Sequence, residues 1–216
     1  MTSATTEPAA GHPVAAVPER LFDDDARERR WRARFTATRM SRPDWARDAP
    51  DRSVYTSNAT GTVEVYTWDR ANGTHRQVTN RRNGTHIATL PPDGETVWWF
   101  ADTDGDEFGH WVTEPFDGRD PDPEAEGAGA SQRATASEER TKPGRQPSGT
   151  EPPPAVPGAE DGYPAGLEIG RRVVAAGTST DDGTRIWVGE RGGPARVVYA
   201  HAEDAGVGAV GRHGIP

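Results

Sequence analysis

Short apolar runs separated by turn residues dominate the pattern of hydrophobic and polar positions, and the strongest run is VWWF at residues 97–100. The run is too short for a buried helix and is rich in residues that favour strands. Turn residues bound it on both sides, PPDG at 91–94 and DTDG at 102–105. Since apolar residues here do not alternate with polar ones, the pattern predicts a strand that is buried on both faces.

Similar strands and turns recur along the chain at a regular spacing. The dipeptide Asn72-Gly73 between two alternating segments is a strong hairpin signal, because both turn residues must adopt positive φ. Val97 follows Val54, and Trp111 follows Trp68, after about 43 residues, and a four-strand unit that repeats at about 40 to 45 residues is typical of a β-propeller blade. The strands of the first two sets are expected at residues 53–56, 62–69, 74–79, 85–90, 95–102 and 110–116.

A segment rich in proline and glycine interrupts this repeat. Residues 119–162 contain Val156 as their only large apolar residue, and such a composition cannot bury enough surface to offset the entropy of ordering. We therefore expect a disordered insertion at the place of the outer strand of the second blade. Strand patterns resume at residues 167–169, 172–178, 184–190 and 195–201, and residues 202–210 are compatible with the start of a fourth blade.

The predicted architecture is all-β, a partial β-propeller of about three four-stranded blades with a short N-terminal helix and a long disordered insertion. The helix falls between residues 19 and 38, where acidic residues at 23–25 precede a run of arginines, an order that suits the helix dipole. The divisions are a disordered tail (1–18), a lead-in segment with the helix (19–51), the first two strand sets (52–118), the insertion (119–162), a further blade (163–210) and a truncated tail (211–216).

The composition limits the binding partners and the cellular compartment that we expect for this protein. A formal charge of −9 argues against general nucleic-acid binding, and the basic stretch RERRWRAR at residues 27–34 is interpreted as a solvated helix face. Cysteine is absent, which excludes disulfides, thiolate metal sites and cysteine nucleophiles. No segment resembles a signal peptide or reaches the roughly 18 apolar residues of a membrane span, so we expect a cytoplasmic protein with no nucleic-acid or membrane partner.

The acidic turn at residues 102–107 is the first candidate for chemistry. Its carboxylates are those of Asp102, Asp104, Asp106 and Glu107, and carboxylate oxygens are the ligands that calcium prefers. An EF-hand loop has Gly at position 6, and placing Gly105 there would make Phe100 the first ligand, so the spacing fails. The turn is therefore predicted to be a solvated hairpin, and no metal site is assigned.

Two further groups of polar residues also favour structural interpretations. Asn58, Asn72 and Asn83 each begin an acceptor pattern for N-glycosylation, but no secretory signal accompanies them and Asn-Gly turns explain two of the three. The histidines lie at positions 12, 75, 86, 110, 201 and 213 without ligand spacing. The H-x-E string at 201–203 lacks the downstream cysteine pair of zinc deaminases, so these histidines are predicted to be surface or strand-end residues.

A serine hydrolase would need its nucleophile on a strained G-x-S-x-G turn, with Asp and His later in the chain. The nearest strings, GTSTD at 177–181 and GASQR at 129–133, both lack the second glycine. We assign no catalytic, cofactor-binding or metal residue and expect no cofactor. Whether the chain has any enzymatic activity of its own stays open.

A series of strings marks the predicted strands and turns. They are PDWA (43–46), APDR (49–52), YTWD (66–69), RQVT (76–79), PDGETVWWF (92–100), DTDGDEFG (102–109) and YAHAEDAG (199–206). In their order and spacing they resemble the N-terminal propeller of bacterial prolyl oligopeptidase family serine peptidases, particularly acylaminoacyl-peptidase-like members. The resemblance covers about residues 19–118 and 163–210.

This resemblance implies a propeller of seven or eight blades that caps an α/β-hydrolase domain and admits only small peptides. The chain has about three such blades, the long insertion and no hydrolase-domain sequence, so no catalytic residue of the family is carried over to it. The predicted function is that of a catalytically silent propeller fragment, which in the intact protein gates the access of small peptides to a missing C-terminal hydrolase domain. The alternative is a non-enzymatic, propeller-like binding or interaction module that self-associates through open blade edges.

Overall fold

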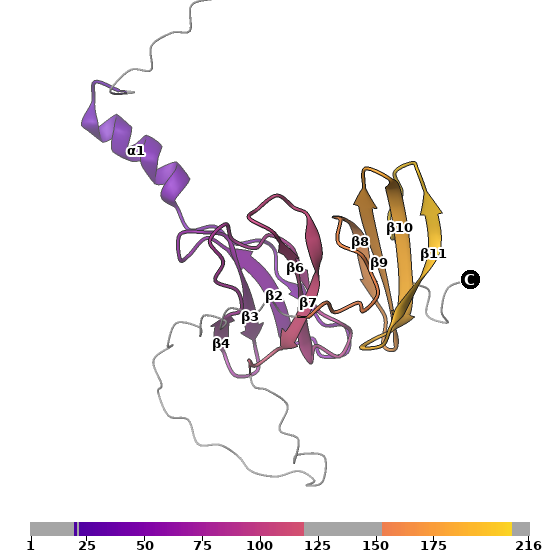
Figure 1. Ribbon diagram of the computed structural model, residues 1–216. Coiled ribbons are helices and arrows are strands. Elements are labelled where there is room, and N and C mark those ends of the chain that lie inside the picture. The colour runs from indigo at the N-terminus through magenta and orange to yellow at the C-terminus, as the bar shows by residue number, and fades with distance from the viewer. Residues whose placement is uncertain (1–19, 21, 119–152, 209–216) are drawn as a thin grey trace, which may run out of the picture. The chain divides into compact units, whose positions relative to one another are not determined.

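The computed structural model describes residues 20, 22–118 and 153–208, which belong to two compact units, Met1–Ala37 and Thr38–Pro216 (Figure 1). The expected tails at 1–18 and 211–216 and most of the expected insertion lie outside the described residues. Within the described part of the chain, no helix has the length and apolar character that crossing a bilayer requires.

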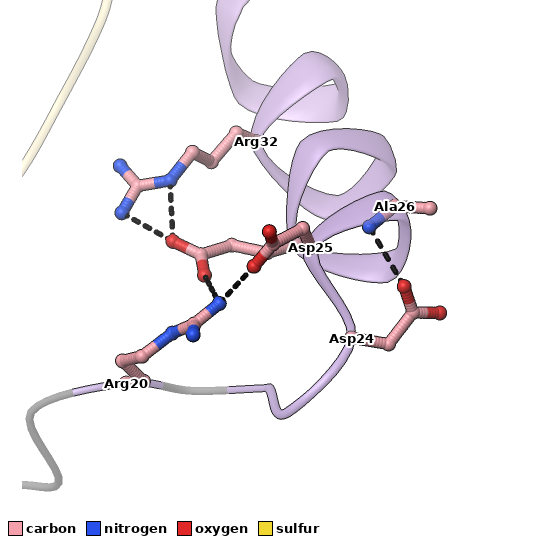
Figure 2. A network of polar contacts seen from close by, with 6 residues as sticks. Arg20, Asp24, Asp25, Ala26 and Arg32 are labelled. Atoms are coloured by element: carbon pink, nitrogen blue, oxygen red, sulfur yellow. Dashed lines mark hydrogen bonds and ion pairs between the residues drawn. The ribbon is translucent and has the colours of Figure 1, made fainter.

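The first unit contains helix α1, Asp25–Thr36, which confirms the predicted short helix. Asp24 caps the helix, since its side chain accepts a hydrogen bond of 2.8 Å from the backbone N–H of Ala26 (Figure 2). Asp25 and Glu28 lie in the first turn and Arg34 in the last, an order of charges that favours the helix dipole. No residue of α1 is buried, so capping and charge order account for its position in the chain.

The second unit is built from three antiparallel sheets whose strands pair in chain order (Figure 1). The first sheet holds β1 (Asp44–Trp45), β2 (Arg52–Ser57), β3 (Glu64–Asp69) and β4 (Thr74–Gln77). The middle sheet holds β5 (Ala88–Thr89), β6 (Thr96–Asp102) and β7 (Gly109–Pro115). The third sheet holds β8 (Tyr163–Ile169), β9 (Val173–Thr180), β10 (Gly183–Glu190) and β11 (Ala195–His201).

The middle sheet is buried on both faces, as the apolar run at 97–100 predicts. One core cluster joins it to the first sheet and includes Val54, Val65, Val97, Trp99 and Val112. A second cluster joins it to the third sheet and includes Trp98, Phe100, Trp111, Val174, Ala176 and Trp187. Successive residues of β6 therefore point to opposite neighbours, as strand geometry requires. Consecutive meander sheets stacked face to face are the arrangement of propeller blades, so the fold is an all-β partial β-propeller.

The structural repeat differs by one residue from the spacing visible in the sequence. A spacing of about 43 equates Val54 with Val97, but Val54 faces the sheet that follows its own, whereas Val97 faces the sheet that precedes its own. At this place in the middle sheet the residue that faces the following sheet is Trp98. Because side chains alternate along a strand, a one-residue offset moves every side chain to the other face.

Residues 153–162, here called the edge segment, differ from the expected disorder. The segment lies beside β7 through isolated bridges at Val112–Pro154 and Gly109–Gly162, and Val156 is 3% exposed. The backbone N–H of Ala155 donates to the Trp111 carbonyl at 2.6 Å. The free edge of β7 offers backbone partners, and the one large apolar side chain of the segment enters the core, which explains why this part of the insertion is ordered. Residues 119–152 lie outside the described residues.

The chain returns across the third sheet after β11. The backbone N–H of Val207 donates to the Ala165 carbonyl at 2.9 Å, and that of Ala205 donates to Thr184 Oγ1 at 3.3 Å. Residues 202–208 form no strand, and residues 209–210 lie outside the described part of the chain. The expected fourth blade is therefore represented only by a segment that reaches the β8 edge of the third sheet.

Candidate functional site

The acidic turn between β6 and β7 is held by its own carboxylates. The Asp106 side chain accepts from the N–H of Phe108 at 3.0 Å, and Asp104 and Glu107 adopt positive φ of 54° and 63°. Arg81 donates to the Asp102 carbonyl and lies over the Trp99 ring at 5.4 Å. These contacts are those of a hairpin turn. In the described ranges no three His, Asp or Glu side chains are placed to share a metal ion.

The asparagines and histidines of interest lie at turns and strand ends. Asn72 donates to Asp69 at 2.7 Å in the β3–β4 turn. Gly73 has φ 64°, but Asn72 does not adopt positive φ, so the expectation that both turn residues do so is wrong. Asn58 Oδ1 accepts from the Arg39 N–H at 2.6 Å. His201 Nδ1 accepts from the N–H of Glu203 at 3.1 Å, so the H-x-E string closes the turn after β11. His12 and His213 lie outside the described residues.

The serine strings contribute no nucleophile turn among the described residues. Ser179 lies inside β9 and pairs with Thr184 in the regular β9–β10 ladder. Ser131 lies outside the described residues. A strand interior is the opposite of the strained, exposed turn on which a hydrolase presents its serine.

Ion pairs tie the sheets together at the turns that enter β2, β6 and β9 and at the turn between β10 and β11. Arg171 donates twice to Asp48, at 2.9 and 3.1 Å, and this hydrogen bonding lowers the Asp48 pKa. Arg191 pairs with Asp93 of the β5–β6 turn. Both contacts join the third sheet to an earlier one. Because Asp48 and Arg171 are well exposed to solvent, their pair fixes geometry more than it contributes stability.

A more buried pair joins the first and middle sheets. Arg76 of β4 donates to Glu114 of β7 at 2.6 Å and to the Phe116 carbonyl at 3.1 Å. Burial raises the Glu114 pKa above its ordinary value, and the hydrogen bond and charge of Arg76 offset part of that rise. The carboxylate and guanidinium are both committed to the interface between sheets.

Glu64 is a buried carboxylate that sequence reasoning missed. It is 0% exposed at the start of β3 and accepts from Thr79 Oγ1 at 2.6 Å, from the Arg81 N–H at 2.9 Å and from Thr62 Oγ1 at 3.1 Å. These donors come from the segments on either side of β3 and β4. Glu64 is therefore a polar anchor for the loops of the first sheet.

The first sheet carries aromatic rings on the face opposite its core, here called the aromatic face. It consists of Tyr55, Tyr66, Trp68 and His75 from β2, β3 and β4. Tyr55 stacks on Tyr66 with ring centroids 5.4 Å apart, and Trp68 stacks on His75 at 5.3 Å. Tyr55 Oη and His75 Nδ1 are 3.0 Å apart. Burial, and then the neighbouring Tyr66, raise the Tyr55 pKa.

The third sheet carries small and branched side chains on the face opposite its core, here called the aliphatic face. It consists of Ala175, Ile186, Val188 and Tyr199 from β9, β10 and β11. Tyr199 is 40% exposed, whereas Ala175 is 3% exposed. Among the described residues, no further sheet packs on either the aromatic or the aliphatic face. The chain after β11 covers one end of the aliphatic face, where Ala205 donates to Thr184 Oγ1. The alternation of Tyr66 and Trp68 along β3 was the sequence signal that could have revealed the aromatic face.

These observations define a section of a β-propeller with two open sheet faces. No protein-family model matches the chain. No curated protein matches it either. Among solved structures, it is similar to TolB from Acinetobacter baumannii, with 13% sequence identity and a TM-score of 0.41. The match covers 74% of this chain and 31% of the TolB chain, so this chain corresponds to less than a third of that protein.

Proposed function

We propose that this chain is a non-catalytic section of a β-propeller, which in a larger assembly forms part of a ring that gates small peptides on their way to a serine peptidase active site. The observation that carries the proposal is the contrast between the middle sheet, buried on both faces, and the two outer sheets, each with one open face. A propeller blade needs a neighbour on each face, so the two outer sheets require further blades.

The strings that resemble the prolyl oligopeptidase family support the gating role. PDGETVWWF spans the β5–β6 turn and most of β6, and DTDGDEFG spans the β6–β7 hairpin. YAHAEDAG spans the end of β11 and the chain that follows it. The motifs thus coincide with the turns and buried strands of the blades. The proposal places the protein in the cytoplasm, with peptides as ligands of the assembled enzyme and without nucleic acid or membrane as partners.

Peptide hydrolysis tests this proposal. The purified chain is expected to show no turnover of an aminoacyl-p-nitroanilide, because its only described serine string lies inside a strand. The coding sequence downstream of Pro216 is expected to contain a G-x-S-x-G hydrolase domain, in frame or after a frameshift. Joining that domain to the chain should give hydrolysis that falls steeply with peptide length. Turnover by the chain alone, or the absence of a hydrolase sequence, would contradict the proposal.

The open faces also favour a second candidate function, that of an interaction module that self-associates without an enzyme partner. One face is rich in large rings and the other in small and branched side chains, so the two faces are complementary in shape. Size-exclusion chromatography with light scattering discriminates between the candidates. A discrete symmetric oligomer favours the interaction module, and a monomer or aggregate favours the peptidase section.

A further inference from the structure

The two interfaces within the molecule follow one rule. Each sheet has a forward face, which points toward the sheet that follows it in the chain, and a backward face, which points toward the sheet before it. In each interface the forward face of one sheet packs on the backward face of the next. The first interface sets the forward Val54 and Val65 against the backward Trp99. The second sets the forward Trp98 and Phe100 against the backward Val174 and Ala176, with Trp187 beside them. Large rings thus pack among small or branched side chains at both interfaces, and at the second interface the backward face adds a ring of its own, Trp187.

The two open faces are one forward face and one backward face, the same combination that forms the two interfaces within the molecule. The aromatic face is the backward face of the first sheet, and Tyr55 points backward from β2 as Trp99 does from β6. The aliphatic face is the forward face of the third sheet, and Ala175 points forward from β9 as Val54 does from β2. The molecule therefore carries both halves of a third interface at its opposite ends, and its own chain does not join them.

We propose that the aliphatic face of one copy packs on the aromatic face of a second copy, and that two copies close a ring of six blades through two identical contacts related by a two-fold axis. Each copy supplies three sheets, and six blades lie within the range of about four to eight found in propellers. A contact between two different faces forms a closed assembly only when the rotation per copy completes a circle. Two copies meet this condition if the three blades of each copy turn through half a circle.

A second copy is the partner that we propose, because its contact would continue the stacking of the existing interfaces. The predicted contact repeats the arrangement of the interfaces already present, with the partly exposed Tyr55 and Trp68 facing Ile186 and Val188. His75 holds Tyr55 through the 3.0 Å contact between Nδ1 and Oη, so the ring of Tyr55 is oriented before the copies meet. This inference rests on the second candidate function, the self-associating module. It concerns the chain by itself.

The test uses two charge substitutions, Trp68→Glu on the aromatic face and Val188→Glu on the aliphatic face. Light scattering across a concentration series should give twice the chain mass for the wild type. The dimer of each variant should have a dissociation constant at least about tenfold higher than that of the wild type, because a carboxylate in the interface loses its hydration. Ala71→Glu, in the exposed β3–β4 turn, introduces the same charge and should remain dimeric. Circular dichroism checks that each variant is folded, and His75→Glu and Tyr199→Glu, both at exposed positions, replace any variant that is not.

Mixing the two variants separates this arrangement from other dimers. The Trp68→Glu chain keeps an intact aliphatic face and the Val188→Glu chain keeps an intact aromatic face, so an equimolar mixture should regain one contact and form a heterodimer. A symmetric contact between two aromatic faces would leave the Val188→Glu chain dimeric and would overturn the proposal. A wild type that is monomeric at all concentrations would also overturn it, together with the second candidate function. Such a result would leave the peptidase proposal intact, since the hydrolysis assay tests that proposal separately.

Discussion

The middle sheet and the first sheet show how one strand pattern serves two different surroundings. In β6 both faces are apolar, and Val97, Trp98, Trp99 and Phe100 are all nearly inaccessible to solvent. In β2 and β3 one face is apolar, while the other combines rings with hydroxyl groups and the carboxylate of Glu64. A blade with two neighbours is therefore held by them, whereas a sheet with one open face relies on polar anchoring within itself.

The largest predicted effect separates the two kinds of face. Trp98→Ala should lower the free energy of unfolding by about 3–5 kcal/mol, because this ring is 2% exposed and its loss leaves a cavity between two sheets. Trp68→Ala, on the aromatic face, is the matched control and should cost about 1 kcal/mol or less at concentrations where the copies do not associate. Urea unfolding followed by tryptophan fluorescence measures both. Equal losses would show that the two faces are packed alike.

The polar anchor of the first sheet is the next test. Glu64→Ala should cost about 2–3 kcal/mol, because it leaves the buried donors of Thr79 and Arg81 without their acceptor. Glu95→Ala, at an exposed position, is the control and should change stability by less than about 0.5 kcal/mol. Hydrogen exchange of the Arg81 amide should accelerate in Glu64→Ala alone. Unchanged exchange at Arg81 would mean that the carboxylate does not hold this loop.

The edge segment should respond locally. Val156→Ala should cost about 2 kcal/mol and should speed hydrogen exchange at Ala155 and Gly162, whose amides donate to β7. Val198→Ala makes the same change at a side chain that is 41% exposed, and should leave these amides protected. If exchange at both amides stays slow in Val156→Ala, the segment is held by its backbone bridges and not by its buried side chain.

The smallest effect concerns the pH dependence of the interface between the first and middle sheets. The folded pKa of Glu114 lies above its ordinary value, so the folded state binds this proton more readily than the unfolded state does. The stability linked to this group is full below the ordinary pKa of 4.5 and is lost as pH rises through the folded pKa. The wild type should therefore lose some free energy of unfolding through Glu114 as pH rises from acid toward neutral, and Glu114→Gln should abolish that loss. Thermal melts across that range measure it, with Glu95→Gln as the control. An unchanged pH profile in Glu114→Gln would contradict the raised pKa.

Much of the fold could be predicted because its signals are local. The capping residue and charge order of α1, the Asn72-Gly73 hairpin and the apolar run of β6 each depend on residues close in sequence. Local signals could not predict which neighbouring sheet each repeated side chain faces. Val54 and Val97 match in type and spacing, and only the packing of three sheets shows that they face in opposite senses along the stack.

The candidate surfaces and anchors were harder to predict, because they depend on pairing across strands. Tyr55 and His75 meet only because β2, β3 and β4 are in register, and Glu64 is anchored by donors from two loops. The order of the edge segment likewise depends on a free edge that β7 offers, which the composition of residues 119–162 does not reveal. Composition predicts how much surface a segment can bury, but it does not predict what that segment will meet.

The two-sided burial of the middle sheet is tested most directly by nuclear Overhauser contacts of its two adjacent tryptophans. The structure predicts contacts from the Trp99 indole to the methyl groups of Val54 and Val65, and from the Trp98 indole to those of Val174. Both sets should be seen in one sample of the wild-type chain. Contacts from both indoles to the same set of methyl groups, or the two sets exchanged, would contradict the stacking of three blades described here.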